Sequence, residues 1–117
     1  MARVVAVFDD LLLGSNVLGM LRAAGHDAEL SGGADVHPDG AAVLIVDLAS
    51  GGFDGVALVE RLHAEGELER TRTLGVDVRV DADTKRRAEA AAFDLVVPRS
   101  RMAREGAALV ERLTAAG

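Results

Sequence analysis

The stretch VLIVDLASGGFDGVALVERL, residues 43–62, decides the fold of this chain. It begins with an unbroken apolar run, 43–46, ends that run on Asp47, and continues through a glycine-rich loop. Such a run is typical of a strand that is buried on both faces of a parallel sheet. Small and apolar residues then recur at the spacing of one helix face: Gly55, Leu58, Val59 and Leu62. The stretch therefore predicts a strand, a loop and a helix.

The same alternation of strand and helix extends over the whole chain. A strand at 3–8 leads into a helix that closes on Gly25, and a short strand follows at 27–30. The segment 31–40 is rich in glycine and proline and leaves no room for a full helix before the strand at 41–47. The remaining predicted elements are a weak strand at 72–76, a helix at 81–92 capped by Asp81 or Asp83, a strand at 93–98 and a last helix capped by Ser100. Ser15 is also interpreted as a helix cap. This alternation predicts a doubly wound α/β sheet with right-handed crossovers.

Composition limits the classes of function. The chain has 117 residues, half of them hydrophobic, which is enough for one domain over 1–117 with a real core. It has no cysteine, so disulfides and thiolate metal sites are excluded. A net charge of −6 argues against nonspecific binding of nucleic acid. The sequence shows neither a signal peptide nor about 18 continuous apolar residues, so we expect a cytoplasmic protein without a membrane contact.

Three carboxylates fall at the carboxyl ends of predicted strands. Asp9 and Asp10 follow the first strand, and Asp47 closes the third. If the strand order is 2-1-3-4-5, these strands are neighbours, and the three side chains converge where such sheets bind ligands. Like charges in one pocket repel each other unless a cation lies between them, and Mg²⁺ is the hard cation that prefers oxygen ligands. The three acids therefore predict a metal site, with helix capping as the alternative for Asp9 and Asp10.

With these residues the chain resembles the receiver domains of two-component response regulators. The pair at 9–10 is similar to the metal-binding pair of that family, and VDLASGGFDG, residues 46–55, is similar to the segment whose first aspartate accepts a phosphoryl group. The resemblance implies a flavodoxin-like sheet of five parallel strands in the order 2-1-3-4-5, here with the second helix shortened or absent. It implies Asp47 as the catalytic phosphoacceptor, Mg²⁺ as the cofactor, and a histidine kinase or an output protein as the partner.

Several positions depart from the pattern of the family, among them Ser50 and Gly51, where receivers usually have a Met-Pro pair. The switch threonine or serine of receivers falls at Val76 or, with a shifted register, at Asp77, and neither side chain carries a hydroxyl. The lysine of receivers aligns with Pro98 or with Val97, so it is missing as well. The resemblance is therefore to an atypical receiver that keeps the acids and lacks the residues that respond to phosphorylation.

Arg99 is the candidate to replace the missing lysine. A guanidinium group can bind carboxylate or phosphate oxygens through two donors, whereas a lysine acts as a point charge. We therefore predict that Arg99 contacts a phosphate group or a carboxylate beside Asp47. Arg101 and Arg104 follow in the same segment and are interpreted as solvent-exposed residues.

Two functions remain open at this point. The first is a signalling domain that is phosphorylated on Asp47 with Mg²⁺. The second is a pseudo-receiver, which acts as a protein-interaction module without phosphorylation. The sequence offers no general base, no nucleophile pair and no cofactor motif of an enzyme, so we expect that the chain is not one.

The predicted contact surface lies at the C-terminal end of the sequence. The helix at 81–92 offers mainly alanine to the core and carries Lys85, Arg86 and Arg87 outward. Together with the strand at 93–98 and the last helix, it predicts a mobile, basic surface for a homodimer or for an acidic partner.

Overall fold

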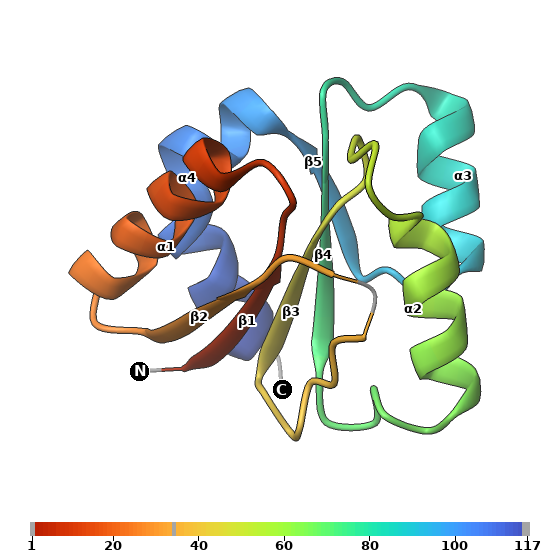
Figure 1. Cartoon of the computed structure of the whole chain (residues 1–117), viewed down its shortest axis with the longest axis horizontal. Helices are drawn as coiled ribbons and strands as arrows, with labels where there is room; N and C mark the ends of the chain where they lie inside the picture. Colours follow the sequence, from red (N-terminus) through yellow and green to blue (C-terminus); the bar gives the residue numbers. More distant parts are fainter. Residues whose placement is uncertain (1, 34, 116–117) are drawn as a thin grey trace.

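The computed structural model describes residues 2–33 and 35–115, which form a five-stranded sheet flanked by four helices (Figure 1). In chain order the elements are β1 (Arg3–Val7), α1 (Leu11–Ala23), β2 (Asp27–Ser31), β3 (Val43–Asp47), α2 (Gly55–Ala64), β4 (Arg72–Asp77), α3 (Ala82–Ala90), β5 (Leu95–Pro98) and α4 (Arg99–Ala115). All neighbouring strands are parallel, in the order β2-β1-β3-β4-β5. The predicted flavodoxin-like order is confirmed, and the described residues between β2 and β3 contain no helix, in line with the prediction of a shortened or absent second helix.

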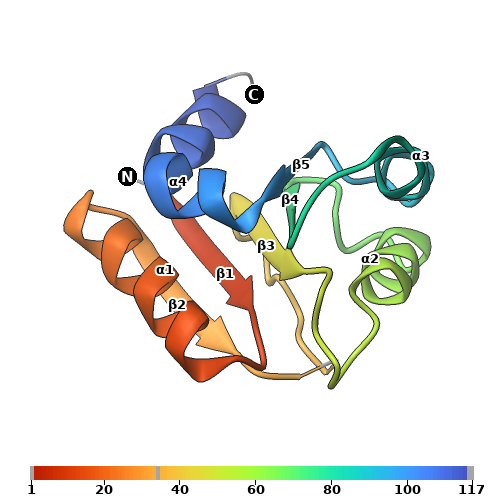
Figure 2. The ribbon, with the colours of Figure 1, turned by 90° about the horizontal axis from the view of Figure 1, so that it is seen from above.

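Helices cover both faces of the sheet (Figure 2). Helices α1 and α4 pack on one face, where they meet Val4 and Ala6 of β1, and α2 and α3 pack on the other, where they meet Val5 and Val7. All five residues of β3 are buried, as its apolar run requires in the centre of a parallel sheet. The side chains of this central strand, Asp47 included, are therefore covered by helices on both faces of the sheet.

The connection between β2 and β3, residues 32–42, contains no helix among its described residues. Val36 and Ala41 instead fold onto the sheet and join the core beneath α2. The guanidinium of Arg3 donates to two carbonyl groups of this loop, at 3.3 and 2.9 Å. The loop thus fills part of the space that a second helix would occupy.

Two predicted helix caps are wrong, and both errors concern serine. Ser15 lies inside α1, because Asp10 already has the extended backbone (φ −77, ψ 104) and the side-chain acceptor of an N-cap. Ser100 lies in the first turn of α4, because this helix begins at Arg99, directly after β5. At α3 the cap is Asp81, one of the two residues predicted.

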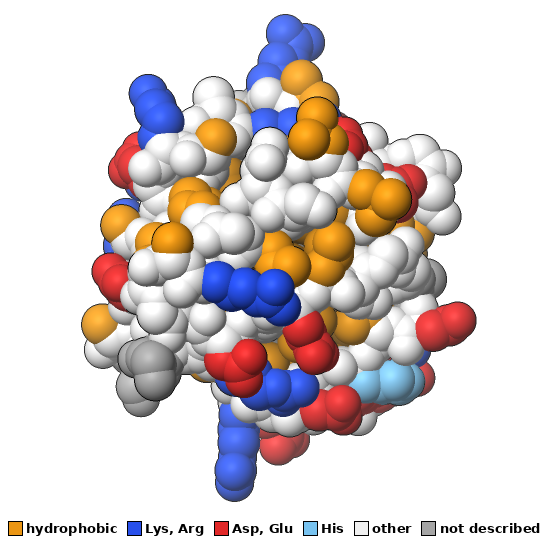
Figure 3. Space-filling model, turned by 60° about the vertical axis from the view of Figure 1, so that its left-hand side comes forward, with side chains coloured by type: hydrophobic (Ala, Val, Ile, Leu, Met, Phe, Trp, Pro, Cys, Tyr) orange, Lys and Arg blue, Asp and Glu red, His pale blue; other side chains and the backbone are white. Residues whose placement is uncertain are grey.

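The surface is mixed in character. On the side of α1 and β2, hydrophobic side chains lie among charged groups of both signs (Figure 3). The large hydrophobic side chains that are exposed in the described ranges are Leu11, Leu12 and Val78, all beyond the carboxyl ends of strands. None of the described helices is long and apolar enough to cross a membrane.

Candidate functional site

Asp47 closes β3 at the carboxyl edge of the sheet, and its side chain is fully buried. Its Oδ1 accepts a hydrogen bond from the backbone N–H of Ala49 at 3.1 Å. The Nη2 atom of Arg99 lies 3.2 Å from Oδ2 and 3.4 Å from Oδ1. A buried carboxylate without a counter-charge is strongly destabilising. The arginine therefore explains how an otherwise apolar strand can end on an aspartate.

Arg99 reaches this position because α4 starts where β5 ends. Pro98 is the last residue of the strand and Arg99 the first of the helix, so no loop separates them. The arginine side chain is 32% exposed, and within the described part of the chain its buried Nε has no hydrogen-bond partner. One nitrogen, Nη2, makes both contacts with Asp47 at distances that are long for charged hydrogen bonds. The contact is thus an end-on ion pair, and contact with a phosphate group stays a prediction.

Asp9 and Asp10 lie at the same edge but have different surroundings. Oδ1 of Asp10 accepts the backbone N–H of Leu13 at 3.1 Å and caps α1, as the alternative interpretation proposed. Asp9 is exposed, and its carboxylate lies against Gly52 in the loop after β3, where an added Cβ would overlap it. In residues 2–33 and 35–115, no group of three histidine, aspartate or glutamate side chains could hold a metal ion. In this arrangement Asp10 and Asp47 are engaged by other groups, so the three acids do not form a common set of ligands, and the Mg²⁺ site stays a prediction.

The end of β4 lies beside Asp47 and offers no hydroxyl. The strand register pairs Asp47 with Val76, which is fully buried, and the carbonyl group of Val76 accepts the N–H of Leu48 at 2.7 Å. The carboxylate of the next residue, Asp77, accepts the N–H of Val78 at 2.7 Å. Neither of the two positions predicted for the switch hydroxyl of receivers, Val76 and Asp77, thus offers one beside Asp47.

A polar network at the amino ends of β4 and β5, on the other side of the sheet from the carboxyl end where Asp47 lies, was not predicted from the sequence. Thr73 is buried, and its hydroxyl donates to the carbonyl group of Ala92 at 2.7 Å. Asp94 accepts the backbone N–H of Thr73 at 2.8 Å and lies 3.7 Å from the guanidinium of Arg72. The signal in the sequence was a threonine inside an apolar strand. These bonds fix the turn between α3 and β5.

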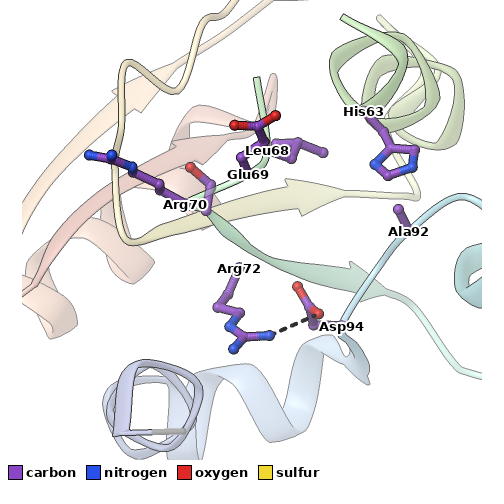
Figure 4. A pocket seen from close by; sticks show the side chains of 8 residues that line it. His63, Leu68, Glu69, Arg70, Arg72, Ala92 and Asp94 are labelled. Atoms are coloured by element: carbon purple, nitrogen blue, oxygen red, sulfur yellow. Dashed lines mark ion pairs between the residues drawn. The ribbon is translucent and has the colours of Figure 1, made fainter. Parts of the chain in front are cut away.

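This network borders a polar cavity of about 560 Å³ near the amino end of β4 (Figure 4). His63 of α2 and Ala92 line one side of it, while Arg72 and Asp94 form an ion pair on another. Charges of both signs are present in its wall and partly neutralise each other. The cavity lies at the amino end of the strands, whereas Asp47 lies at the carboxyl end.

An ion pair fastens the loop that replaces the second helix. Nδ1 of His37 lies 2.8 Å and 3.2 Å from the two carboxylate oxygens of Glu67, which follows α2. The hydrogen bond and the charge of Glu67 raise the pKa of His37 above its ordinary value, and the bond from His37 lowers the pKa of Glu67. Both pKa shifts favour the charged form of the residue, so the ion pair is strongest at pH values at which His37 is protonated and Glu67 is ionised.

Comparisons with known proteins bear on the fold. No protein-family model matches the sequence, and a search of curated proteins found no relative. The signal receiver domain of the response regulator NarL from Mycobacterium tuberculosis superposes with a TM-score of 0.85 at 18% identity, over 99% of this chain and 98% of that chain. The chemotaxis protein CheY4 from Vibrio cholerae superposes with a TM-score of 0.83 at 18% identity, over 97% of this chain and 98% of that chain. The chain has the fold of response-regulator receiver domains. A pilus assembly-related protein from Burkholderia pseudomallei is also similar, with a TM-score of 0.80 at 18% identity, over 98% of this chain and 90% of that chain.

Proposed function

We propose that the chain is a receiver-like signalling domain that acts through protein contacts and does not require phosphorylation of Asp47. The observation that carries this proposal is the ion pair of a fully buried Asp47 with Arg99. An acceptor carboxylate must offer a free oxygen to phosphorus while a cation neutralises the phosphoryl oxygens. Here both oxygens of Asp47 face a guanidinium, and Val76 supplies no hydroxyl that could respond to a phosphoryl group.

A second candidate is phosphorylation on Asp47 with Mg²⁺ bound by Asp9, Asp10 and Asp47. It is favoured by the position of Asp9, whose carboxylate lies against the loop that follows β3. This function would require Asp10 to leave the cap of α1 and the guanidinium of Arg99 to leave Asp47. Arg99 would then be the natural contact for the phosphoryl oxygens.

Mass spectrometry of the intact protein separates the two candidates. The wild type is incubated with acetyl phosphate and MgCl₂, next to an Asp47→Asn variant as the control. We expect the same unmodified mass for both proteins, because the carboxylate is neutralised by Arg99. Addition of one phosphoryl group to the wild type but not to Asp47→Asn would contradict the first candidate and establish the second.

We further propose that α3, β5 and α4 form the contact surface, either for a second copy of the chain or for an acidic partner protein such as a histidine kinase or an output protein. In α3 the buried residue is Ala88, so the helix is held by little apolar area. Lys85, Arg86 and Arg87 are exposed on it, and Asp83 lies 3.1 Å from Arg86 and 3.8 Å from Arg87. The helix carries these three cationic side chains against Asp83 and Glu89, so it keeps a positive excess on a protein with a net charge of −6.

Charge reversal tests this surface. The double variant Arg86→Glu with Arg87→Glu should weaken self-association or partner binding without unfolding the domain, because both side chains are exposed. Analytical ultracentrifugation measures the association, and circular dichroism checks the fold. Arg61→Glu with Arg70→Glu, two exposed arginines on α2 and in the loop after it, serves as the matched control with two reversed charges outside this surface. Association that is equal in all variants would remove this surface from the proposal.

A further inference from the structure

The negative charge of the buried Asp47 carboxylate is already balanced by the positive charge of the Arg99 guanidinium. The buried carboxylate carries one negative charge, and the Arg99 guanidinium, with Nη2 at 3.2 and 3.4 Å from the two oxygens, carries one positive charge. A guanidinium group remains protonated at all accessible pH values. The ion pair is therefore neutral without any other ion.

The orientation of Arg99 adds to this effect. Its Nε is a buried donor that has no hydrogen-bond partner in the described residues. Such a donor is satisfied by an acceptor oxygen and not by a second cation. A divalent ion on Asp47 would place two further positive charges next to this guanidinium, where burial weakens the screening by water.

The other two acids do not offset that repulsion in this arrangement. Asp10 is engaged with the N–H of Leu13 at the start of α1, and Asp9 is exposed against Gly52. We infer that Arg99 is the resident cation of the Asp47 pocket and that its guanidinium excludes divalent metal ions from it. This inference rests on the proposed function and deepens it, because it identifies Arg99 as the group that neutralises Asp47 in place of a metal ion.

Titration with Mn²⁺ tests the exclusion. Paramagnetic broadening of backbone amide signals, at residues 9–10 and 46–49, reports binding at this pocket. The wild type should show no selective broadening there. Arg99→Gln removes the positive charge and keeps a polar side chain, so Mn²⁺ should bind at least about tenfold more tightly than to the wild type. Circular dichroism and thermal melting confirm that the variant is folded.

Two controls identify the cause. Arg101→Gln removes a neighbouring arginine that pairs with Glu105 at 3.5 Å, and it should behave as the wild type. Combining Arg99→Gln with Asp47→Asn should abolish the gained affinity, because the buried carboxylate is the ligand.

The outcomes are separable from those of the phosphorylation experiment. Selective broadening in the wild type, equal to that in Arg99→Gln, would overturn the inference, and so would a folded Arg99→Gln protein without affinity. If Arg99→Gln does not fold, selective broadening at these residues in the wild type would still overturn the inference. A wild type that excludes Mn²⁺ but gains a phosphoryl group would overturn the proposed function alone.

Discussion

Replacement of Arg99 by glutamine should measure what the buried Asp47 charge costs when it loses its partner. Breaking a fully buried ion pair by removal of one partner costs about 3 to 5 kcal/mol. Asp47 is completely buried, but Arg99 is 32% exposed, so water already screens part of the interaction. We therefore expect a loss of about 2 to 3 kcal/mol in the free energy of unfolding, below that range for full burial. For a domain of this size the melting temperature should fall by about 10 °C.

A double-mutant cycle isolates the interaction. Unfolding by urea is measured for the wild type, Arg99→Gln, Asp47→Asn and the double variant. Asp47→Asn should be nearly neutral, because it removes the buried charge and leaves an arginine that can turn toward solvent. The double variant should be more stable than Arg99→Gln, with a coupling of about 2 kcal/mol. A loss below about 0.5 kcal/mol for Arg99→Gln, the size expected of a surface pair, would refute the role of Arg99.

Three further predictions follow from other parts of the molecule. Ala92 has a left-handed backbone (φ 74), so Ala92→Gly should raise the stability by about 1 kcal/mol in the same urea assay, and an unchanged midpoint would contradict this. Followed by NMR, His37 should titrate above its ordinary pKa of 6.5, and its pKa should return toward that value in Glu67→Gln. The raised pKa of His37 stabilises the folded state fully below pH 6.5, and the lowered pKa of Glu67 stabilises it fully above pH 4.5. The ion pair should therefore hold the loop best between these pH values and weaken as the pH rises through the folded-state pKa of His37. Hydrogen exchange should be faster in α3 than in α2, whose buried face is larger, and equal rates would remove the mobile surface.

The order of the strands and helices could be predicted from the pattern of apolar runs, helix-spaced apolar residues and glycine or proline breakers along the chain. The apolar run before Asp47 requires a central strand, and the breakers between 31 and 40 leave no room for a helix. The boundaries were less accurate, as in the strand predicted at 93–98, which begins at Leu95. At this point the N–H of Asp94 donates to the carbonyl and hydroxyl oxygens of Thr73, and such long-range bonds have no local signal in the sequence.

The position of the candidate site and a carboxylate contact of Arg99 could be predicted, whereas the separate contacts of the three acids could not. Parallel strands bring Asp9, Asp10 and Asp47 to one edge, and this follows from topology. Which acid caps a helix and which one meets an arginine depends on the direction of each side chain. Arg99 contacts Asp47 because α4 begins without a loop after β5, whereas the expected cap at Ser100 had placed the first helical residue two positions later.

The central claim is that Arg99, and no metal ion, neutralises Asp47. A crystal structure of the wild type grown with MnCl₂ tests it most directly, because anomalous scattering locates manganese independently of the atomic model. We predict the guanidinium of Arg99 on the carboxylate of Asp47, with no anomalous peak at this edge of the sheet. A peak bound to Asp47 together with Asp9 or Asp10, with Arg99 turned away, would contradict the account.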